Sequence, residues 1–233
     1  MKIAVMQPYI FPYIGYFQLI NAVDKFVIFD DVNYKNKGWI NRNNILLNGN
    51  PYRFTIPVSK GSQNKFINEI EISSDIKWEE KFFRTLTASY KKAPFFEETI
   101  SIIKKVIKSD IRSLSNLLRF SILETIDYLS IETEIVESAS IYNNCKLKGQ
   151  ERIIDICIEE NAQSYINLSG GVNIYDEKKF KSHGIELYFL KTNEVNYIQF
   201  SDEFIPNLSI IDIMMFNDKE TIKSFLKSYS LFQ

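Results

Sequence analysis

The segment Lys2–Phe29 limits the folds that this chain can adopt. It begins with a short apolar run, Lys2–Met6 (KIAVM), and ends with a second one, Lys25–Phe29 (KFVIF). Between them the pattern predicts a helix over Pro12–Ala22, since proline is tolerated in the first turn of a helix. A strand, a helix and a second apolar strand in so short a stretch favour a right-handed βαβ unit with parallel strands.

The loop that follows the first predicted strand has an unusual composition. It reads QPYIFPYIGYF, and its prolines and glycine cost local structure while burying little. Ligands of α/β proteins bind at the carboxyl ends of strands, and a helix start can hold an anion on backbone amides. We therefore interpret the loop as one wall of a binding site; the alternative is a tight aromatic corner between helix and sheet. The expected substrate contacts are Gln7, Pro8, Tyr13, Gly15 and Tyr16.

The rest of the chain continues the alternation of strands and helices. Residues 78–130 change to a three-to-four-residue helical periodicity and predict a helical insertion within a single domain, 1–233. The fold class that we expect is α/β, with a mainly parallel Rossmann-like sheet flanked by helices and a small hairpin. Strands are predicted at Ile45–Leu47, Tyr52–Pro57, Phe66–Ile72, Glu132–Val136, Ser164–Leu168 and Ile185–Leu190, with a hairpin turn at Asn48-Gly49, and later helices at Lys148–Glu160, near Phe180, at Ile210–Met215 and at Asp218–Tyr229.

Composition excludes several classes of function. The 28 basic and 29 acidic residues nearly cancel and form no long basic run, so we expect no nucleic-acid partner. Two cysteines that do not form a CxxC pair, together with the single His183, leave too few ligands for zinc, and we expect no metal and no cofactor. The apolar amino-terminal stretch is broken by prolines and glycine, so neither a signal peptide nor a membrane span fits, and a cytoplasmic location is expected.

Two carboxylates, Asp30 and Asp31, come directly after the second predicted strand. A carboxylate at this position could act as a general base or accept a hydrogen bond from a sugar hydroxyl. We therefore predict that one of the two is catalytic. The alternative is an ordinary loop entry, with one carboxylate capping the backbone and the other solvated.

The loop that follows combines cations, an aromatic ring and amides. Arginine can bind an oxyanion through two hydrogen bonds, tryptophan can stack on a ring, and asparagine can read hydroxyls. This combination favours a phosphorylated or nucleotide-linked sugar, although a solvated loop anchored by its tryptophan would look similar. The expected substrate contacts here are Lys37, Trp39, Asn41, Arg42 and Asn43.

Two further turns could complete the same site. One is the start of the predicted helix at Lys148, and the other is a Gly-Gly turn whose amides could form an anion nest. Surface charges and an ordinary turn are the alternatives. The candidate residues in these turns are Lys148, Glu151, Arg152, Ser169, Gly170, Gly171, Tyr175 and Asp176.

The opening loop invites comparison with enzymes that use a strand–turn–helix start for phosphate chemistry. Nucleotidyl transferases of the HxGH type carry two histidines where this chain has Tyr13 and Tyr16. A tyrosine can donate a hydrogen bond but cannot carry positive charge, so a degenerate nucleotidyl transferase is one alternative rather than the leading interpretation.

Several long motifs resemble the WbqC-like family in order and spacing along nearly the whole chain. They are QPYIFPYIGYFQLI, VDKFVIFDDVNY, GWINRN, LKGQERIIDI, INLSGG with Tyr175-Asp176, and FIPNLSIIDIMMFN. The genes of this family are associated with O-antigen and other surface-polysaccharide clusters, so the resemblance implies work on nucleotide-activated sugars. Many members have histidine immediately before the Gln-Pro pair, where this chain has Met6.

Residues and resemblance together favour a transferase that modifies a nucleotide-linked amino sugar in lipopolysaccharide O-antigen synthesis. In the hypothesis, an acyl or aminoacyl donor reacts with the sugar amine, and Asp30 or Asp31 removes the amine proton. Arg42 and Lys148 would hold phosphate or carboxylate, while backbone amides near Gly15 and Gly170 would stabilise negative charge. A non-catalytic scaffold of a polysaccharide assembly complex is the alternative from another class.

Overall fold

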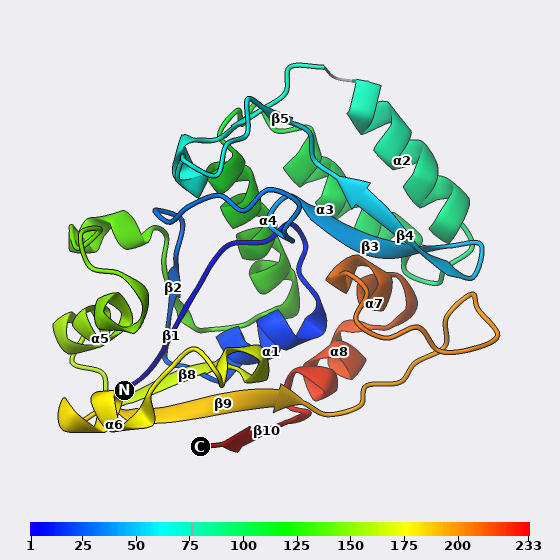
Figure 1. Ribbon diagram of the computed structural model, residues 1–233. Helices are drawn as coiled ribbons and strands as arrows, with labels where there is room; N and C mark the ends of the chain where they lie inside the picture. Colours follow the sequence, from blue (N-terminus) through cyan, green and yellow to red (C-terminus); the bar gives the residue numbers. More distant parts are fainter. Residues whose placement is uncertain (76) are drawn as a thin grey trace.

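The computed structural model describes residues 1–75 and 77–233. Its central sheet has the strand order β10-β9-β8-β1-β2-β7, and all neighbours are parallel except β10 and β9 (Figure 1). The strands are β1 (Lys2–Met6), β2 (Lys25–Ile28), β7 (Glu134–Val136), β8 (Ser164–Leu168), β9 (Glu186–Thr192) and β10 (Tyr229–Phe232). The mainly parallel Rossmann-like sheet that the sequence predicts is therefore confirmed.

Helices cover both faces of this sheet. The helices are α1 (Ile14–Asn21), α2 (Lys77–Tyr90), α3 (Phe96–Ile107), α4 (Leu114–Leu129), α5 (Gly149–Glu159), α6 (Glu177–Ser182), α7 (Ile210–Phe216) and α8 (Lys219–Leu226). In Figure 1, α5 and α6 lie on one side of the sheet and α1 and α4 on the other. The predicted helices all form, and Asp218 caps α8 by accepting a hydrogen bond from the Thr221 amide at 2.7 Å.

Alternation along the strands explains why both faces are covered. Ala4 and Phe26 are buried with α1 in the larger apolar core, whereas Ile3, Val5 and Val27 are buried with α5 and α6 in the smaller one. Successive strand residues point to opposite faces of the sheet. Strands with apolar residues on both faces therefore need helices packed against both faces.

The β-hairpin forms as its turn residues require. Strands β3 (Arg42–Leu47) and β4 (Asn50–Thr55) pair antiparallel, with Leu47 opposite Asn50. Asn48 and Gly49 occupy the turn with φ of 50° and 72°. Positive φ at both central residues is the signature of a type I′ turn, which Asn-Gly accommodates at low cost. The predicted hairpin is confirmed.

Two local predictions are wrong. Within Phe66–Ile72, Ile67–Glu69 form a 3-10 helix, and only the end of the segment is a strand, β6 (Glu71–Ile72), which pairs with β5 (Val58–Ser59). The chain end predicted as helix up to Tyr229 is instead the edge strand β10, which pairs antiparallel with β9. The conformation of a short apolar segment depends on which neighbours in the fold form hydrogen bonds with its backbone. The local sequence pattern alone therefore does not determine whether it is helix or strand.

The strand order reverses direction beside β1. After β1 the chain moves outward through β2 and β7, and it then returns to the other side of β1 for β8 and β9. The parallel strands bring their carboxyl ends to one edge of the sheet, and ligands bind at this edge near such a reversal. No helix in the described ranges is both long and apolar enough to cross a membrane.

Candidate functional site

Loops that follow strands of the sheet enclose a cavity with aromatic walls. Its volume is about 410 Å³, and we call it the aromatic cavity. Residues of the QPYIFPYIGYF loop, of the segment before β3, of β3 itself and of the segment before α7 line it. They are Tyr9, Pro12, Tyr13, Trp39, Asn43 and Asn207. The first and second predicted loops therefore meet at one cavity.

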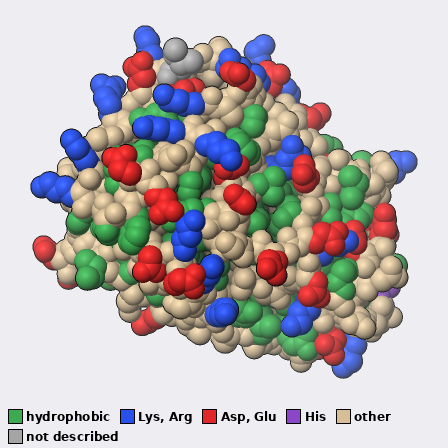
Figure 2. Space-filling view, turned by 180° about the vertical axis from the view of Figure 1, so that it is seen from behind, with side chains coloured by type: hydrophobic (Ala, Val, Ile, Leu, Met, Phe, Trp, Pro, Cys, Tyr) green, Lys and Arg blue, Asp and Glu red, His purple; other side chains and the backbone are tan. Residues whose placement is uncertain are grey.

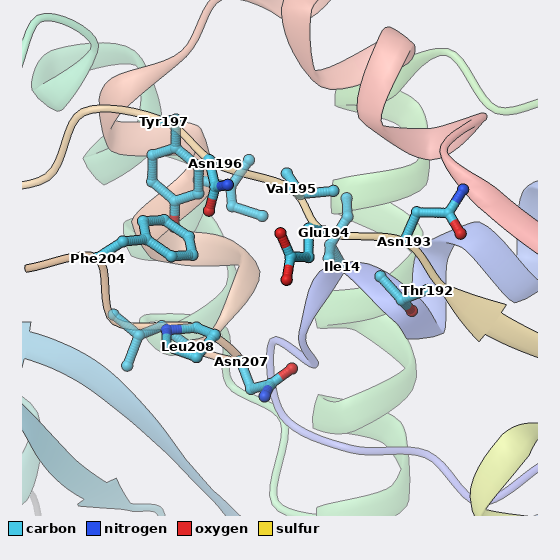
Figure 3. Close-up of a pocket in the computed structure, with 12 residues that line it drawn as sticks. Ile14, Thr192, Asn193, Glu194, Val195, Asn196, Tyr197, Phe204, Asn207 and Leu208 are labelled. Carbon is cyan, nitrogen blue, oxygen red and sulfur yellow. The ribbon is translucent and has the colours of Figure 1, made fainter.

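A second cavity of about 360 Å³ lies where β9 ends, and we call it the strand-end cavity. Figure 3 shows the Glu194 carboxylate pointing into it, with the Asn207 amide nearby and Ile14 of α1 behind. Asn207 lines both cavities, and Tyr13 and Ile14 are consecutive residues, so the two cavities adjoin. The lining residues are Ile14, Thr192, Asn193, Glu194, Val195, Asn196, Tyr197, Phe204, Pro206, Asn207, Leu208 and Ile213.

A strained turn shapes the wall of the aromatic cavity. Phe11 has φ of 39°, a conformation that a bulky residue adopts only when its surroundings impose it. Its carbonyl oxygen accepts hydrogen bonds from Asn43 Nδ2 and from Ser209 Oγ, both at 2.7 Å. The amide of Ile210 donates to the Pro12 carbonyl at 2.9 Å. Segments distant in sequence thus hold the loop in one shape.

Gly15 makes close packing possible where α1 begins. A Cβ atom at this position would lie 2.4 Å from Tyr13 Cε2 and 2.7 Å from Thr192 Oγ1. Such distances are far below van der Waals contact, so a side chain would displace the Tyr13 ring or the end of β9. The glycine therefore sets the position of Tyr13 between the two cavities.

The tyrosines of the opening loop remain neutral hydrogen-bonding groups. Burial raises the pKa of Tyr13, and burial with the nearby Tyr13 hydroxyl raises the pKa of Tyr9. Tyr16 is fully buried and donates a hydrogen bond to the Gln7 carbonyl at 3.0 Å, so it holds the loop to the core. Tyr9 and Tyr13 line the cavity and can donate hydrogen bonds to a ligand, but they are poor proton acceptors.

Asp30 and Asp31 are both buried, and each has protein partners. Asp30 accepts hydrogen bonds from Ser115 Oγ and Ser138 Oγ, both at 2.6 Å. Asp31 Oδ2 forms an ion pair with Arg152 at 2.5 Å, while Asp31 Oδ1 is buried without a hydrogen-bond partner among the described residues. Neither carboxylate lines the aromatic or the strand-end cavity.

Arg152 joins the end of β2 to α5. Its guanidinium lies 4.7 Å from the Phe29 ring centre, and its Nε donates to Asn144 Oδ1 at 2.8 Å. Arg152 is only 3% exposed, so these contacts occupy a side chain that the sequence predicted as a substrate contact. A buried arginine with these contacts fixes α5 against the sheet.

The start of α5 contacts the segment that follows the Gly-Gly turn. Asp176 donates its amide to Gln150 at 2.8 Å, and Glu151 pairs with Lys179 at 2.7 Å. The Tyr175 hydroxyl accepts a hydrogen bond from Asn167 Nδ2 at 3.1 Å. Lys148 is the N-cap of α5 and is exposed. Asp176 thus lies beside α5, and none of the predicted residues Ser169, Gly170, Gly171, Tyr175 and Asp176 lines either cavity.

The remaining predicted residues differ in their surroundings. Asn41 is buried and binds the Tyr34 hydroxyl and the Ile56 carbonyl, so it is part of the framework. Lys37 is exposed, and Arg42 is half-buried with its Nε unpartnered among the described residues. Pro8 is buried within the opening loop and does not line either cavity.

Sequence reasoning missed Glu194, Thr192 and Asn207. Glu194 is the one carboxylate that lines the strand-end cavity, and it follows a strand whose end the pattern placed two residues too early. Asn207 has φ of 59°, which asparagine tolerates better than most residues. A Pro-Asn pair before a buried helix was a usable signal for Asn207, because turns of this type often present an amide.

Charge on the surface is mixed. In Figure 2, acidic and basic side chains are interspersed over the face that is shown. Within the described ranges, no group of three or more His, Cys, Asp or Glu side chains is arranged to hold a metal ion. The single histidine, His183, is exposed at the C-terminal end of α6.

Comparison with known proteins agrees with the motifs. The sequence matches the WbqC-like protein family over residues 7–224. An uncharacterized protein of Mycobacterium tuberculosis, Rv1507c, is 30% identical over 216 residues, which cover 91% of this chain and 92% of that protein. No solved structure matches the chain. Because the family match extends over nearly the whole length, the chain belongs to the WbqC-like protein family.

Proposed function

We propose that this protein is a transferase that modifies a nucleotide-linked amino sugar in the biosynthesis of surface polysaccharide such as O-antigen. The family name is linked to polysaccharide biosynthesis, which supports the setting. The aromatic cavity supports the substrate class, because Tyr9, Tyr13 and Trp39 surround one opening at the carboxyl edge of the sheet.

A sugar suits the chemistry of this cavity. A pyranose ring has apolar faces of C–H groups and a rim of hydroxyls, so aromatic rings can cover its faces while polar groups bind its rim. The raised pKa of Tyr13 keeps its hydroxyl protonated and able to donate a hydrogen bond. The exposed Asn207 borders both cavities, and its amide can bind a hydroxyl at the junction.

The strand-end cavity suits the second substrate and the proton acceptor. In the proposed reaction, Glu194 accepts a proton from the sugar ammonium group. The amine nitrogen then attacks the carbonyl carbon of an acyl or aminoacyl thioester or ester. A C–N bond forms and the C–S or C–O bond breaks, the leaving group takes up the proton held by Glu194, and the nitrogen releases its second proton to solvent. Backbone amides at the start of α1, near Gly15, would stabilise the oxyanion.

We assign the proton-accepting role to Glu194 rather than to Asp30 or Asp31. Both aspartates are buried, and they form hydrogen bonds to Ser115 and Ser138 or an ion pair with Arg152. A general base must come within hydrogen-bond reach of the proton that it removes. Glu194 is exposed and points into a cavity, so it meets this requirement (Figure 3).

The test is a mass measurement on the sugar. Purified protein is incubated with UDP- and dTDP-amino sugars and with acyl and aminoacyl donors, and the sugar should gain the mass of one acyl group. Glu194→Gln should slow the reaction by about 10²–10⁴-fold, the usual contribution of a positioned base. Glu203→Gln, at an exposed carboxylate of the same loop, should keep the rate. No mass gain with any pair, or full activity of Glu194→Gln, would overturn the proposal.

Non-catalytic sugar binding is a second candidate, favoured by the absence of histidine from the lining of both cavities. Met6 ends β1 and does not line them either. If nucleotide sugars raise the melting temperature and no donor gives a product, binding alone is the function. Release of pyrophosphate from ATP would instead identify a nucleotidyl transferase.

A further inference from the structure

A third cavity, which we call the outer cavity, lies between the β3–β4 hairpin and the start of α2. Its volume is about 330 Å³, within the range of small-molecule sites. Phe54 and Phe82 are almost fully buried and lie with ring centres 4.8 Å apart. The lining residues are Tyr52, Arg53, Phe54, Thr55, Pro57, Trp78, Lys81, Phe82 and Thr85.

The outer cavity combines aromatic rings with positive charge. Its two ionic side chains, Arg53 and Lys81, are both cations, and Tyr52 and Trp78 add partly exposed rings. Glu79 and Glu80 occupy the first turn of α2 but do not line the cavity. A flat base can stack on such rings, and phosphate oxygens bind lysine and arginine through charge-assisted hydrogen bonds.

A direct contact links the outer cavity to the aromatic cavity. The Arg53 guanidinium lies over the Trp39 ring, 5.3 Å from its centre. Trp39 lines the aromatic cavity, whereas Arg53 lines the outer one. A ligand that extends from one cavity to the other would therefore pass the guanidinium on its way, where a diphosphate would be bound.

We propose that the outer cavity binds the nucleoside diphosphate part of the substrate. The base stacks on Trp78 and Tyr52, Lys81 and Arg53 bind the diphosphate, and the attached sugar enters the aromatic cavity past Trp39. The inference rests on the proposed function for the sugar, and it adds the site that would recognise the nucleotide.

The two tryptophans allow the two cavities to be observed separately. Trp39 and Trp78 are the only tryptophans of the chain, and each lines a different one of these cavities. In Trp39→Phe protein, titration with UDP or dTDP should change the fluorescence of Trp78. In Trp78→Phe protein, titration with an amino sugar 1-phosphate should change the fluorescence of Trp39.

A matched pair of charge variants tests the phosphate contact. Lys81→Gln should weaken the binding of UDP at least about tenfold, since a charge-assisted hydrogen bond contributes about that factor. Arg84→Gln removes a cation from the same helix but outside the cavity, so it should leave the affinity unchanged. Both positions are exposed, and melting curves should show that both variants fold.

Several results would overturn the assignment. They are UDP binding without a change in Trp78 fluorescence, equal affinities for Lys81→Gln and the unaltered protein, or no nucleotide binding at all. Inorganic pyrophosphate that binds as tightly as UDP would exclude a role for the base. Tighter binding of geranyl diphosphate would indicate a lipid-linked sugar instead. The Trp39 fluorescence separates this assignment from the proposed function. If Trp39 still responds to the sugar phosphate, the proposed function stands even when the nucleotide assignment fails. If Trp39 does not respond, the result counts against the proposed function as well.

Discussion

At the scale of single residues, Gly15 shows how packing can override an intrinsic preference. Alanine is a better helix former than glycine by about 1 kcal/mol, so propensity alone predicts that Gly15→Ala stabilises α1. The added Cβ would lie 2.4 Å from the Tyr13 ring and 2.7 Å from Thr192 Oγ1. Overpacking of this kind costs about 1–3 kcal/mol and should dominate.

We therefore expect Gly15→Ala to lower the free energy of unfolding and to weaken sugar binding, because the Tyr13 ring must move. Urea unfolding and a titration with sugar phosphate measure the two effects. Gly170→Ala is the control, because a Cβ there would meet nothing within 4 Å. An equally stable Gly15→Ala protein with unchanged affinity would contradict the steric argument.

Residue types in this sequence indicate chemistry, but not whether that chemistry is available to a ligand. Arg152 and Asp31 look like an anion-binding group and a base, yet they neutralise each other in the interior. Trp39 and Asn43, chosen by the same reasoning, do line a cavity. The difference arises from which loops the sheet brings together, and that is not encoded in local pattern.

At the scale of elements, a buried carboxylate ties α2, α7 and the loop after β9 together. Asp212 accepts hydrogen bonds from Tyr90 at 2.7 Å, from Tyr197 at 2.6 Å and from Gln199 at 2.8 Å. Tyr90 also accepts a hydrogen bond from the Leu46 amide of β3 at 2.7 Å. The network fixes Tyr197 as a wall of the strand-end cavity.

The two tyrosines should differ in their effect on stability. Tyr90→Phe leaves the Leu46 amide and Asp212 Oδ1 buried without partners, so we expect it to lower the free energy of unfolding by about 2–5 kcal/mol. Tyr197→Phe leaves Gln199 bonded to Asp212 Oδ2 and should cost only about 1 kcal/mol. Denaturant unfolding of both variants measures the difference, and equal losses would show that the Leu46 contact contributes little.

Strong local signals located most elements. The Asn-Gly turn and the helical periodicity of residues 78–130 are each local in sequence, and each is confirmed. Phe66–Ile72 and β10 were missed because their conformations depend on hydrogen-bonding partners elsewhere. For β10 that partner is β9, whose outer edge would otherwise be open.

At the scale of the whole molecule, an ion-pair cluster connects β2 and β7 to the end of α5. Lys25 Nζ lies 2.6 Å from Glu160 and 2.9 Å from Glu134. Burial by itself raises the pKa of Glu160. Hydrogen bonds from Lys25 and Tyr142 lower this pKa by more than burial raises it, so the net pKa lies below its ordinary value of 4.5. The folded state therefore favours the ionised form.

The sign of the pH dependence follows from this shift. The stabilisation by Glu160 should be present above 4.5 and should be lost as the pH falls through the lower pKa of the folded state. Glu160→Gln should remove that part of the acid sensitivity, whereas Glu132→Gln, at an exposed carboxylate, should keep it. Unfolding free energies measured from neutral to acidic pH test this, and identical profiles for Glu160→Gln and the unaltered protein would contradict it.

The sequence by itself determined the α/β class, the βαβ start, the hairpin and the family, because these depend on periodicity and on motifs that are local in the chain. It also predicted the QPYIFPYIGYF loop as a wall of a binding site, and three residues of this loop line a cavity. Only the tertiary structure decided the partners of that loop: Trp39, Glu194 and Asn207 lie near it, whereas Asp31 and Arg152 are buried as a pair. The physical reason is twofold. Parallel strands bring loops that are distant in sequence to one edge of the sheet. Charged groups that are buried pair with each other, and they can contact a ligand only where a cavity reaches them.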